Sequence, residues 1–173
     1  GPSGVGKDRV MEGLRDVVPG LHLVRRVITR PAQAGGEDHD AVTPEDFQEM
    51  KENGAFVVAW TAHGLHYGIP ISVRYHLNKG TDCLVNFSRK ALLAGSEAFP
   101  DFLVLNISAQ AEILAERLAA RGRESEADIA KRLAEADKPL PEGLRVLHLS
   151  NDGPLAQTVA RGAVLLQPET VAP

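Results

Sequence analysis

The chain has 173 residues, of which 43% are hydrophobic and 24% are charged, and its formal net charge is −4. This length and composition predict a single globular domain with a sizeable core, and the slightly acidic balance argues against broad nucleic-acid or anionic-membrane binding. The single cysteine, Cys83, excludes an intrachain disulfide and a thiolate zinc site, and no apolar run approaches the ~20 residues that span a bilayer. We therefore expect a cytoplasmic protein that holds any anionic ligand with locally clustered Arg and Lys.

Expected helices and strands alternate along the chain. Residues 7–18 predict a helix, residues 21–28 a strand, and Gly35-Gly36-Glu37-Asp38 an exposed loop. Thr43-Pro44-Glu45-Asp46 opens the next helix, with Thr43 as N-cap and Pro44 at the first helical position. The later expectations are strands over 55–62, 83–87, 102–107 and 144–149 and helices over 69–80, 109–121, 125–137 and 153–166. This alternation predicts a three-layer α/β sandwich around a mainly parallel sheet.

The first eight residues carry the strongest motif. Gly1, Gly6 and Lys7 match G-x-x-x-x-G-K, a loop whose backbone N–H groups approach phosphate oxygens and whose following helix points its positive dipole end at the same anion. The alternative is a glycine-rich turn that merely precedes a helix. We assign ATP binding to the whole loop, with Lys7 also catalytic: Gly1, Pro2, Ser3, Gly4, Val5, Gly6, Lys7 and Asp8. Because such a loop normally follows a buried strand, we expect the native protein to begin several residues earlier.

Asp8 departs from this motif. The usual Ser or Thr after the lysine helps to hold Mg²⁺, whereas a carboxylate could bind the metal directly or through water. The alternative is an acid that only complements the helix dipole. We name Asp8 as the candidate metal ligand and Mg²⁺ with ATP as the expected cofactors.

Further segments resemble the guanylate-kinase-like group of P-loop kinases over essentially the whole chain. They are Thr29-Arg30-Pro31, His63-Gly64-Leu65-His66-Tyr67-Gly68, Arg117-Leu118-x-x-Arg121-Gly122, Arg132-Leu133 and Ser150-Asn151-Asp152. The resemblance implies one kinase domain over residues 1–173, with an acceptor-binding insertion at about 29–70 and a small helical lid at about 117–132. It also implies ATP contacts from Arg117, Arg121, Asn151 and Asp152 and catalytic roles for Arg30, Arg121 and Arg132.

The chain also departs from guanylate kinases. Gln33 stands where they carry a second arginine, and Asp38-His39-Asp40 lacks their tyrosine. Their guanine-reading glutamate falls near Val58, and residues 55–62 contain no acid. GMP is therefore a poor candidate, because polar contacts supply most of such selectivity.

A narrower resemblance fits these departures. The chain is similar to the ribose 1,5-bisphosphate phosphokinase family in its phosphate loop with Asp8 and in Ala34-Gly35-Gly36-Glu37-Asp38-His39, Val85-Asn86-Phe87-Ser88-Arg89, Arg121-Gly122-Arg123-Glu124 and Asn151-Asp152-Gly153. This family implies ATP-dependent conversion of ribose 1,5-bisphosphate to 5-phosphoribosyl 1-diphosphate. We expect a phosphorylated sugar as the small-molecule partner, and neither nucleic acid nor a membrane. The alternatives are a guanylate-kinase-type nucleoside monophosphate kinase and a guanylate-kinase-like binding module without catalysis.

The expected acceptor site contains Arg30, Tyr67, Asn86, Ser88 and Arg89. The planar fork of Arg30 suits a phosphate, whereas its alternative role is a solvated loop arginine. Tyr67 would donate its hydroxyl to the same phosphate or serve only as a packing aromatic. Arg89 would hold the sugar bisphosphate, and Asn86 stands where many P-loop enzymes place an acid near the metal.

Arginines gather around Gly122, which is a plausible hinge. Arg117, Arg121, Arg123 and Arg132 would close onto the ATP phosphates as a lid, and the alternative is a solvated helix face. Trp60 and Cys83 are expected in the core, and His63 and His66 in ordinary hydrogen bonds.

Overall fold

The structure is a computed structural model, and it describes all residues except 35, 121, 123–124, 137 and 168–173. The chain forms two compact units. The first unit contains Gly1–Pro19, Leu103–Leu140 and the segment from Arg145 onward; the second contains Gly20–Phe102 and Pro141–Leu144. In the described part of the chain, no helix combines the length and the apolar character that crossing a membrane requires.

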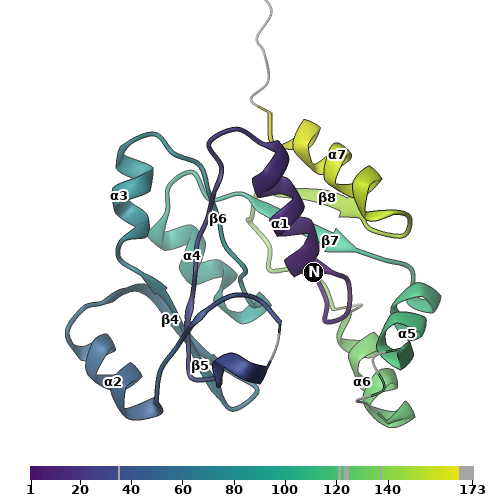
Figure 1. The fold of residues 1–173 in the computed structure, drawn as a ribbon, viewed down its shortest axis with the longest axis horizontal. Helices are drawn as coiled ribbons and strands as arrows, with labels where there is room; N and C mark the ends of the chain where they lie inside the picture. Colours follow the sequence, from purple (N-terminus) through teal and green to yellow (C-terminus); the bar gives the residue numbers. More distant parts are fainter. Residues whose placement is uncertain (35, 121, 123–124, 137, 168–173) are drawn as a thin grey trace, which may run out of the picture. The chain divides into compact units, whose positions relative to one another are not determined.

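The described residues of the first unit form two parallel strands and four helices, which are labelled in Figure 1. Strands β7 (Val104–Ser108) and β8 (Val146–Ser150) pair residue by residue, from Val104 with Val146 to Ser108 with Ser150. The helices are α1 (Lys7–Val17), α5 (Ala111–Ala120), α6 (Glu126–Ala136) and α7 (Leu155–Leu165). Helices α1 and α7 pack side by side, and the buried core of this unit includes Val5, Val10, Leu14, Ile107, Leu118 and Leu149.

The second unit is built around a mixed four-stranded sheet in the order β3-β2-β5-β4. Its strands are β2 (Val27–Ile28), β3 (Asp40–Ala41), β4 (Phe56–Ala62) and β5 (Leu65–Pro70). A separate parallel pair joins β1 (His22–Leu23) and β6 (Cys83–Leu84). The remaining elements are η1 (Ala32–Ala34), α2 (Pro44–Glu52), α3 (Val73–Asn78), η2 (Arg89–Ala91) and α4 (Leu92–Ala98).

The expected starts of helices α1 and α2 are confirmed. Helix α1 begins at Lys7 as expected, and Thr43 caps α2 by accepting a hydrogen bond from the Asp46 amide at 3.1 Å. The expected strand over 21–28 is interrupted and becomes β1 and β2, and the strand over 83–87 shortens to Cys83–Leu84. Trp60 and Cys83 pack against the core cluster of Val24, Val58, Ile69 and Val73, as expected.

One expected helix start was wrong. Ile69 and Pro70 end strand β5, and the helix begins only at Val73. The physical reason lies at His63 and Gly64, whose φ angles of 52° and 73° make a two-residue hairpin turn between β4 and β5. The chain therefore returns as a second strand directly after the turn.

Strand pairing is parallel in β1–β6, β2–β3 and β7–β8 and antiparallel in β2–β5 and β4–β5. The described strands thus confirm an α/β fold.

Candidate active site

The phosphate loop of the first unit has a backbone that only glycine adopts easily. Gly4 and Gly6 have φ angles of 87° and 89°, and a Cβ at Gly4 would lie 2.8 Å from the side chain of Leu118. Gly6 directly precedes α1, and Lys7 Nζ donates hydrogen bonds to the carbonyls of Gly1 at 3.1 Å and Pro2 at 2.9 Å. The lysine ammonium thus lies across the mouth of the loop, where a phosphate would compete with these carbonyls for it.

Asn151 supports this loop from within the first unit. Its Nδ2 donates to the Val5 carbonyl at 2.8 Å, its backbone N–H donates to Ser108 at 2.8 Å, and the residue is only 5% exposed. Its Oδ1 is buried and has no hydrogen-bond partner among the described residues. The amide therefore fixes the loop backbone, and the ATP contact expected of Asn151 stays a prediction.

Asp152 joins two turns of the first unit. Its carboxylate accepts hydrogen bonds from the Ser150 hydroxyl and from the Gln110 backbone N–H, the latter at 2.7 Å. These two bonds, the Ser150 bond foremost, lower the pKa of Asp152 below its ordinary value. Asp152 is therefore a turn-forming carboxylate at the start of α5, and its contact with ATP also stays a prediction.

The structure brings one arginine of the expected lid to the phosphate loop. Arg132, on α6, donates a hydrogen bond from Nη1 to the Ser3 hydroxyl. Helix α6 starts in a reciprocal cap: the Ser125 hydroxyl accepts from the Asp128 amide at 3.2 Å and donates to the Asp128 carboxylate at 2.7 Å. This pairing lowers the pKa of Asp128.

Of the other arginines of the expected lid, the structure describes only Arg117. Arg117 Nη1 is buried without a hydrogen-bond partner in the described part of the chain, which leaves a donor available to an anion. Gly122 adopts a φ of 62° in a turn, as a helix break requires. Arg121 and Arg123 lie outside the described residues.

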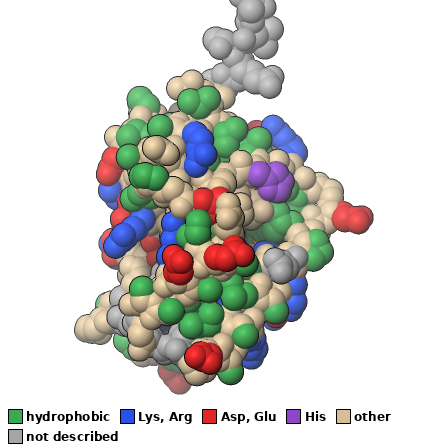
Figure 2. Space-filling model, turned by 90° about the vertical axis from the view of Figure 1, so that its right-hand side faces the viewer, with side chains coloured by type: hydrophobic (Ala, Val, Ile, Leu, Met, Phe, Trp, Pro, Cys, Tyr) green, Lys and Arg blue, Asp and Glu red, His purple; other side chains and the backbone are tan. Residues whose placement is uncertain are grey.

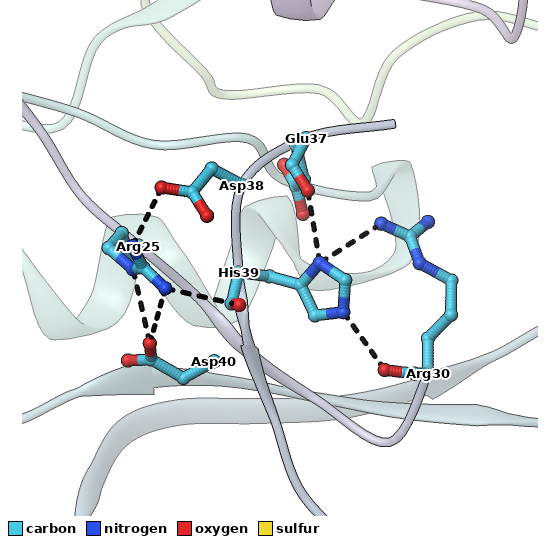
Figure 3. Close-up of polar contacts among 6 residues, drawn as sticks. All are labelled: Arg25, Arg30, Glu37, Asp38, His39 and Asp40. Atoms are coloured by element: carbon cyan, nitrogen blue, oxygen red, sulfur yellow. Dashed lines mark hydrogen bonds and ion pairs between the residues drawn. The ribbon is translucent and has the colours of Figure 1, made fainter. Parts of the chain in front are cut away.

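In the second unit, Arg25 and Arg26 hold the loop of residues 36–40, hereafter the 36–40 loop, and Figure 3 draws the contacts of Arg25. Arg25 binds Asp38 at 2.7 Å and Asp40 at 2.8 Å in exposed contacts, and it donates to the partly buried His39 carbonyl at 3.3 Å. Arg26 is 7% exposed and reaches the Glu37 carboxylate with both Nε and Nη2. The expectation of an exposed loop is therefore wrong for Glu37, because its carboxylate is drawn inward by a buried guanidinium.

Aromatic rings and an amide complete the surroundings of this pair. The guanidinium of Arg26 lies 4.9 Å from the Tyr67 ring centre and 5.7 Å from that of Trp60, and these two rings, paired across β4 and β5, stack 5.5 Å apart. Asn86 Nδ2 donates to Glu37 Oε2 at 3.1 Å. Two residues assigned to the acceptor site, Tyr67 and Asn86, thus converge on one buried ion pair.

Arg30 follows β2 and is fixed by His39. The His39 Nε2 lies 2.9 Å from the Arg30 carbonyl. Its Nδ1 lies 3.3 Å from Arg30 Nη2 and 3.0 Å from the Glu37 carbonyl, and the residue is 6% exposed (Figure 3). Arg30 Nε is buried without a partner among the described residues, so the guanidinium is oriented yet retains donors for a ligand.

Ser88, Arg89 and Asp8 are the remaining residues to which the sequence assigned a role, and their roles stay predictions. Ser88 precedes η2 and keeps a buried hydroxyl unpartnered by any described residue, and Arg89 is the first residue of η2. Asp8 stands in the first turn of α1. The described residues contain no cluster of three or more His, Cys, Asp or Glu side chains that could hold a metal ion.

Sequence reasoning missed Arg25, Arg26, Glu37 and His39 as members of this network. The available signal was the pairing of a double arginine with the run Glu37-Asp38-His39-Asp40, two short segments of opposite charge. On the face drawn in Figure 2, Lys and Arg side chains are interspersed with Asp and Glu, so anion binding depends on such local groups.

A glycine loop that opens a helix, with a lysine across it, places this α/β fold in the class of P-loop nucleotide-binding proteins. A guanylate kinase from Anaplasma phagocytophilum shares the fold, with a TM-score of 0.64 and 20% identity over 99% of this chain and 83% of that one. No family model matches the chain.

Two curated relatives are far more similar in sequence. The ribose 1,5-bisphosphate phosphokinase PhnN of Ruegeria sp. is 46% identical over 98% of this chain and 90% of its own length. That of Pseudomonas fluorescens is 45% identical over 93% of this chain and 88% of its own length. The chain therefore belongs to the ribose 1,5-bisphosphate phosphokinase PhnN family, which confirms the resemblance seen in the sequence.

Proposed function

We propose that this protein transfers the γ-phosphoryl group of ATP to ribose 1,5-bisphosphate. An oxygen of the 1-phosphate attacks the γ-phosphorus, the bond from that phosphorus to the β–γ bridging oxygen breaks, and ADP leaves. The product is 5-phosphoribosyl 1-diphosphate (PRPP). The observation that carries the proposal is the intact phosphate loop and lysine in a chain that matches this family over 98% of its length.

The first unit holds the donor in this proposal. Backbone N–H groups of residues 1–8 and the N-terminus of α1 surround the phosphates of ATP, and Lys7 exchanges its loop carbonyls for them. Arg132 already reaches the loop through Ser3, and Arg117 Nη1 is buried without a hydrogen-bond partner among the described residues. Arg121, Asn151 and Asp152 complete the expected ATP site, with Arg121 and Arg132 neutralising charge in the transition state.

The second unit holds the acceptor. Arg30, oriented by His39, grips an acceptor phosphate with its planar donors. Tyr67, Asn86, Ser88 and Arg89 line the rest of the sugar bisphosphate site. Phosphoryl transfer then needs the two substrates to meet in line, and positioning with positive charge supplies most of the catalysis.

Mg²⁺ fits the donor set around the phosphate loop, because Asp8 offers the carboxylate oxygens that this ion prefers. Asp8 would hold it directly or through water. When bound, the ion neutralises phosphate charge.

The working enzyme is, in this proposal, one guanylate-kinase-like domain with a mainly parallel sheet. Its acceptor-binding insertion spans about residues 29–70 and its helical lid about residues 117–132. A cytoplasmic location remains the prediction drawn from the lone Cys83.

Guanine recognition finds no support in the second unit. Val58, near the position of the guanine-reading acid, is 5% exposed and packs in a cluster with Val24, Ile69 and Val73. The likeness to guanylate kinase concerns the fold alone. A non-catalytic module is opposed by Lys7 and Arg132, since both catalytic cations contact the loop.

One assay tests the proposal. ADP release is measured with ribose 1,5-bisphosphate and separately with GMP, and the product is identified by mass. We expect turnover to PRPP with the sugar and little with GMP, and loss of turnover in Lys7→Met. Turnover with GMP alone would overturn the proposal, and ATP binding without turnover of either acceptor would favour the binding module.

A further inference from the structure

The buried pair of Arg26 and Glu37 has no role in the function proposed so far. The side chain of Arg26 is 8% exposed and that of Glu37 is 15% exposed. Two nitrogens of Arg26, Nε and Nη2, donate to the same oxygen, Glu37 Oε1. Removing two charges from water offsets much of their attraction, so packed apolar residues often serve stability equally well. The pair therefore invites an explanation other than stability.

Glu37 retains hydrogen-bonding capacity on its second oxygen. Among the described residues, Oε2 accepts only from Asn86 Nδ2, at 3.1 Å, and a carboxylate oxygen can accept two hydrogen bonds. The same bond fixes Asn86 with its own acceptor, Oδ1, beside the carboxylate. Two oriented acceptors side by side complement two neighbouring hydroxyl donors, which is the arrangement of a vicinal diol.

The surroundings of the pair also suit a polar, phosphorylated ligand. Arg30 Nε, Trp60 Nε1 and Ser88 Oγ are each buried without a partner in the described residues. Buried donors of this kind are costly unless something completes them. Trp60 flanks Arg26, and Ser88 lies two residues after Asn86.

Arg30 connects this network to the expected phosphate position. A Cβ built on Gly36, the residue before Glu37, would lie 3.4 Å from Arg30 Nη2. His39 contacts both the Glu37 carbonyl, at 3.0 Å, and Arg30. The 36–40 loop therefore both carries the Glu37 carboxylate and contacts Arg30 through His39, so a ligand at this loop could meet an acceptor of hydroxyls and a donor to a phosphate.

We propose that Glu37 and Asn86 accept hydrogen bonds from the two ring hydroxyls of the ribose and so select a ribofuranose acceptor. Glu37 Oε2 takes one hydroxyl, Asn86 Oδ1 takes the other, and Arg26 is a positioning residue that orients the carboxylate through Oε1. This inference rests on the proposed function, because it assumes ribose 1,5-bisphosphate as the acceptor.

Deoxygenated acceptors provide the test. The kcat/KM of the wild-type enzyme is compared for ribose 1,5-bisphosphate and its 2-deoxy and 3-deoxy analogues. A site built to bind hydroxyls leaves its acceptors unpaired with an analogue, so we expect a preference of about 10²-fold or more for the ribo form. In Asn86→Ala the preference for the ribo form over the analogue that lacks the hydroxyl bound by Asn86 is expected to fall by about tenfold or more.

A double variant separates recognition from folding. Arg26→Met with Glu37→Leu removes both charges at once, so no buried charge remains unpaired. The ribo preference should fall below about tenfold in this variant, whereas its affinity for ATP should stay as in the wild type. Arg25→Met is the matched control, since Arg25 holds the exposed side of the same loop through Asp38 and Asp40. The preference of this variant for the ribo form over the deoxy analogues should stay within about twofold of the wild-type value.

Binding to the unmodified enzyme gives a second measurement. Trp60 is the only tryptophan and flanks Arg26, so its fluorescence reports the acceptor site. We expect ribose 1,5-bisphosphate to bind at least about tenfold more tightly than either deoxy analogue. Equal affinities, or a double variant that keeps the ribo preference, would overturn the inference. An enzyme that fails to turn over ribose 1,5-bisphosphate at all would instead overturn the proposed function and the inference with it.

Discussion

Arg132 and Ser3 are 129 residues apart in the chain, and a hydrogen bond joins the guanidinium of one to the hydroxyl of the other. The bond sets α6 against the phosphate loop within one compact unit. A positive charge thus lies at the loop that is expected to receive the ATP phosphates.

The first prediction concerns this charge. Arg132→Met is expected to lower kcat by about 10³-fold, because an arginine that neutralises transition-state charge contributes at least that much. Single-turnover measurements at saturating ATP would check this. Lys131→Met, at the exposed neighbouring position on α6, is the control and should change kcat by less than about twofold. Equal losses in the two variants would remove Arg132 from the catalytic set.

The second prediction concerns the support of the loop. Asn151→Leu removes the amide that donates to the Val5 carbonyl, so the free energy of unfolding is expected to fall by about 1–3 kcal/mol. The distorted loop should also bind ATP more weakly. Urea unfolding and a nucleotide titration measure the two effects, and a variant with wild-type ATP affinity would show that Asn151 is dispensable to the loop.

The third prediction concerns His39 as a positioning residue for Arg30. His39→Phe keeps a planar ring but loses both hydrogen bonds to Arg30, so KM for the acceptor should rise about tenfold or more while KM for ATP stays unchanged. His39→Gln retains an amide donor and acceptor and should recover part of the loss. Asp38→Asn is the control in the same loop, since Asp38 is 74% exposed in its side chain. A rise in both KM values in His39→Phe would indicate a general structural defect.

The fourth prediction follows from a stacked histidine pair. The rings of His22 and His76 lie 3.8 Å apart, and burial, together with the neighbouring His76, lowers the pKa of His22 below its ordinary value of 6.5. Because the pKa of His22 is lower in the folded state, the unfolded state binds more protons as the pH falls. The contribution of His22 to the free energy of unfolding is therefore fully present above pH 6.5 and is lost as the pH falls through the folded-state pKa. Urea unfolding at about pH 7.5 and pH 5 should show this fall, and His22→Gln should make it smaller. An identical pH dependence in the variant would exclude His22 as its source.

The fifth prediction concerns Asp8. If its carboxylate holds Mg²⁺, Asp8→Ala should raise the magnesium concentration that gives half-maximal activity, with little change in stability because Asp8 lies on the partly exposed first turn of α1. An unchanged magnesium titration would contradict this role and leave Asp8 as an acid that complements the helix dipole.

The phosphate loop was predictable because its chemistry is local: glycines, a lysine and the start of a helix stand within eight residues, and the structure shows the expected turn. The same is true of α2, whose cap is written in Thr43 and Pro44. Strand β5 was missed because its existence depends on the two-residue turn at His63 and Gly64, which we had interpreted only as a motif.

The acceptor network was harder to predict because it is tertiary. Glu37 lies next to Gly36 and Asp38 in a polar sequence, and nothing in that sequence shows that its carboxylate meets Arg26 and Asn86, the latter 49 residues away. Arg30 could be assigned to a phosphate from its motif, but the ring of His39 that orients it could not. Pairing across a sheet decides such contacts, and short strands such as β2 and β3 leave little periodic pattern in the sequence.

The ion pair between Glu37 and buried Arg26 also determines at which stage the 36–40 loop takes its structure. Because Arg26 is buried, opening the 36–40 loop would strand an unpaired guanidinium in the interior, so the loop is shaped as the protein folds. If a sugar phosphate binds at this loop as proposed, folding has already placed the loop, and binding does not include the cost of ordering it.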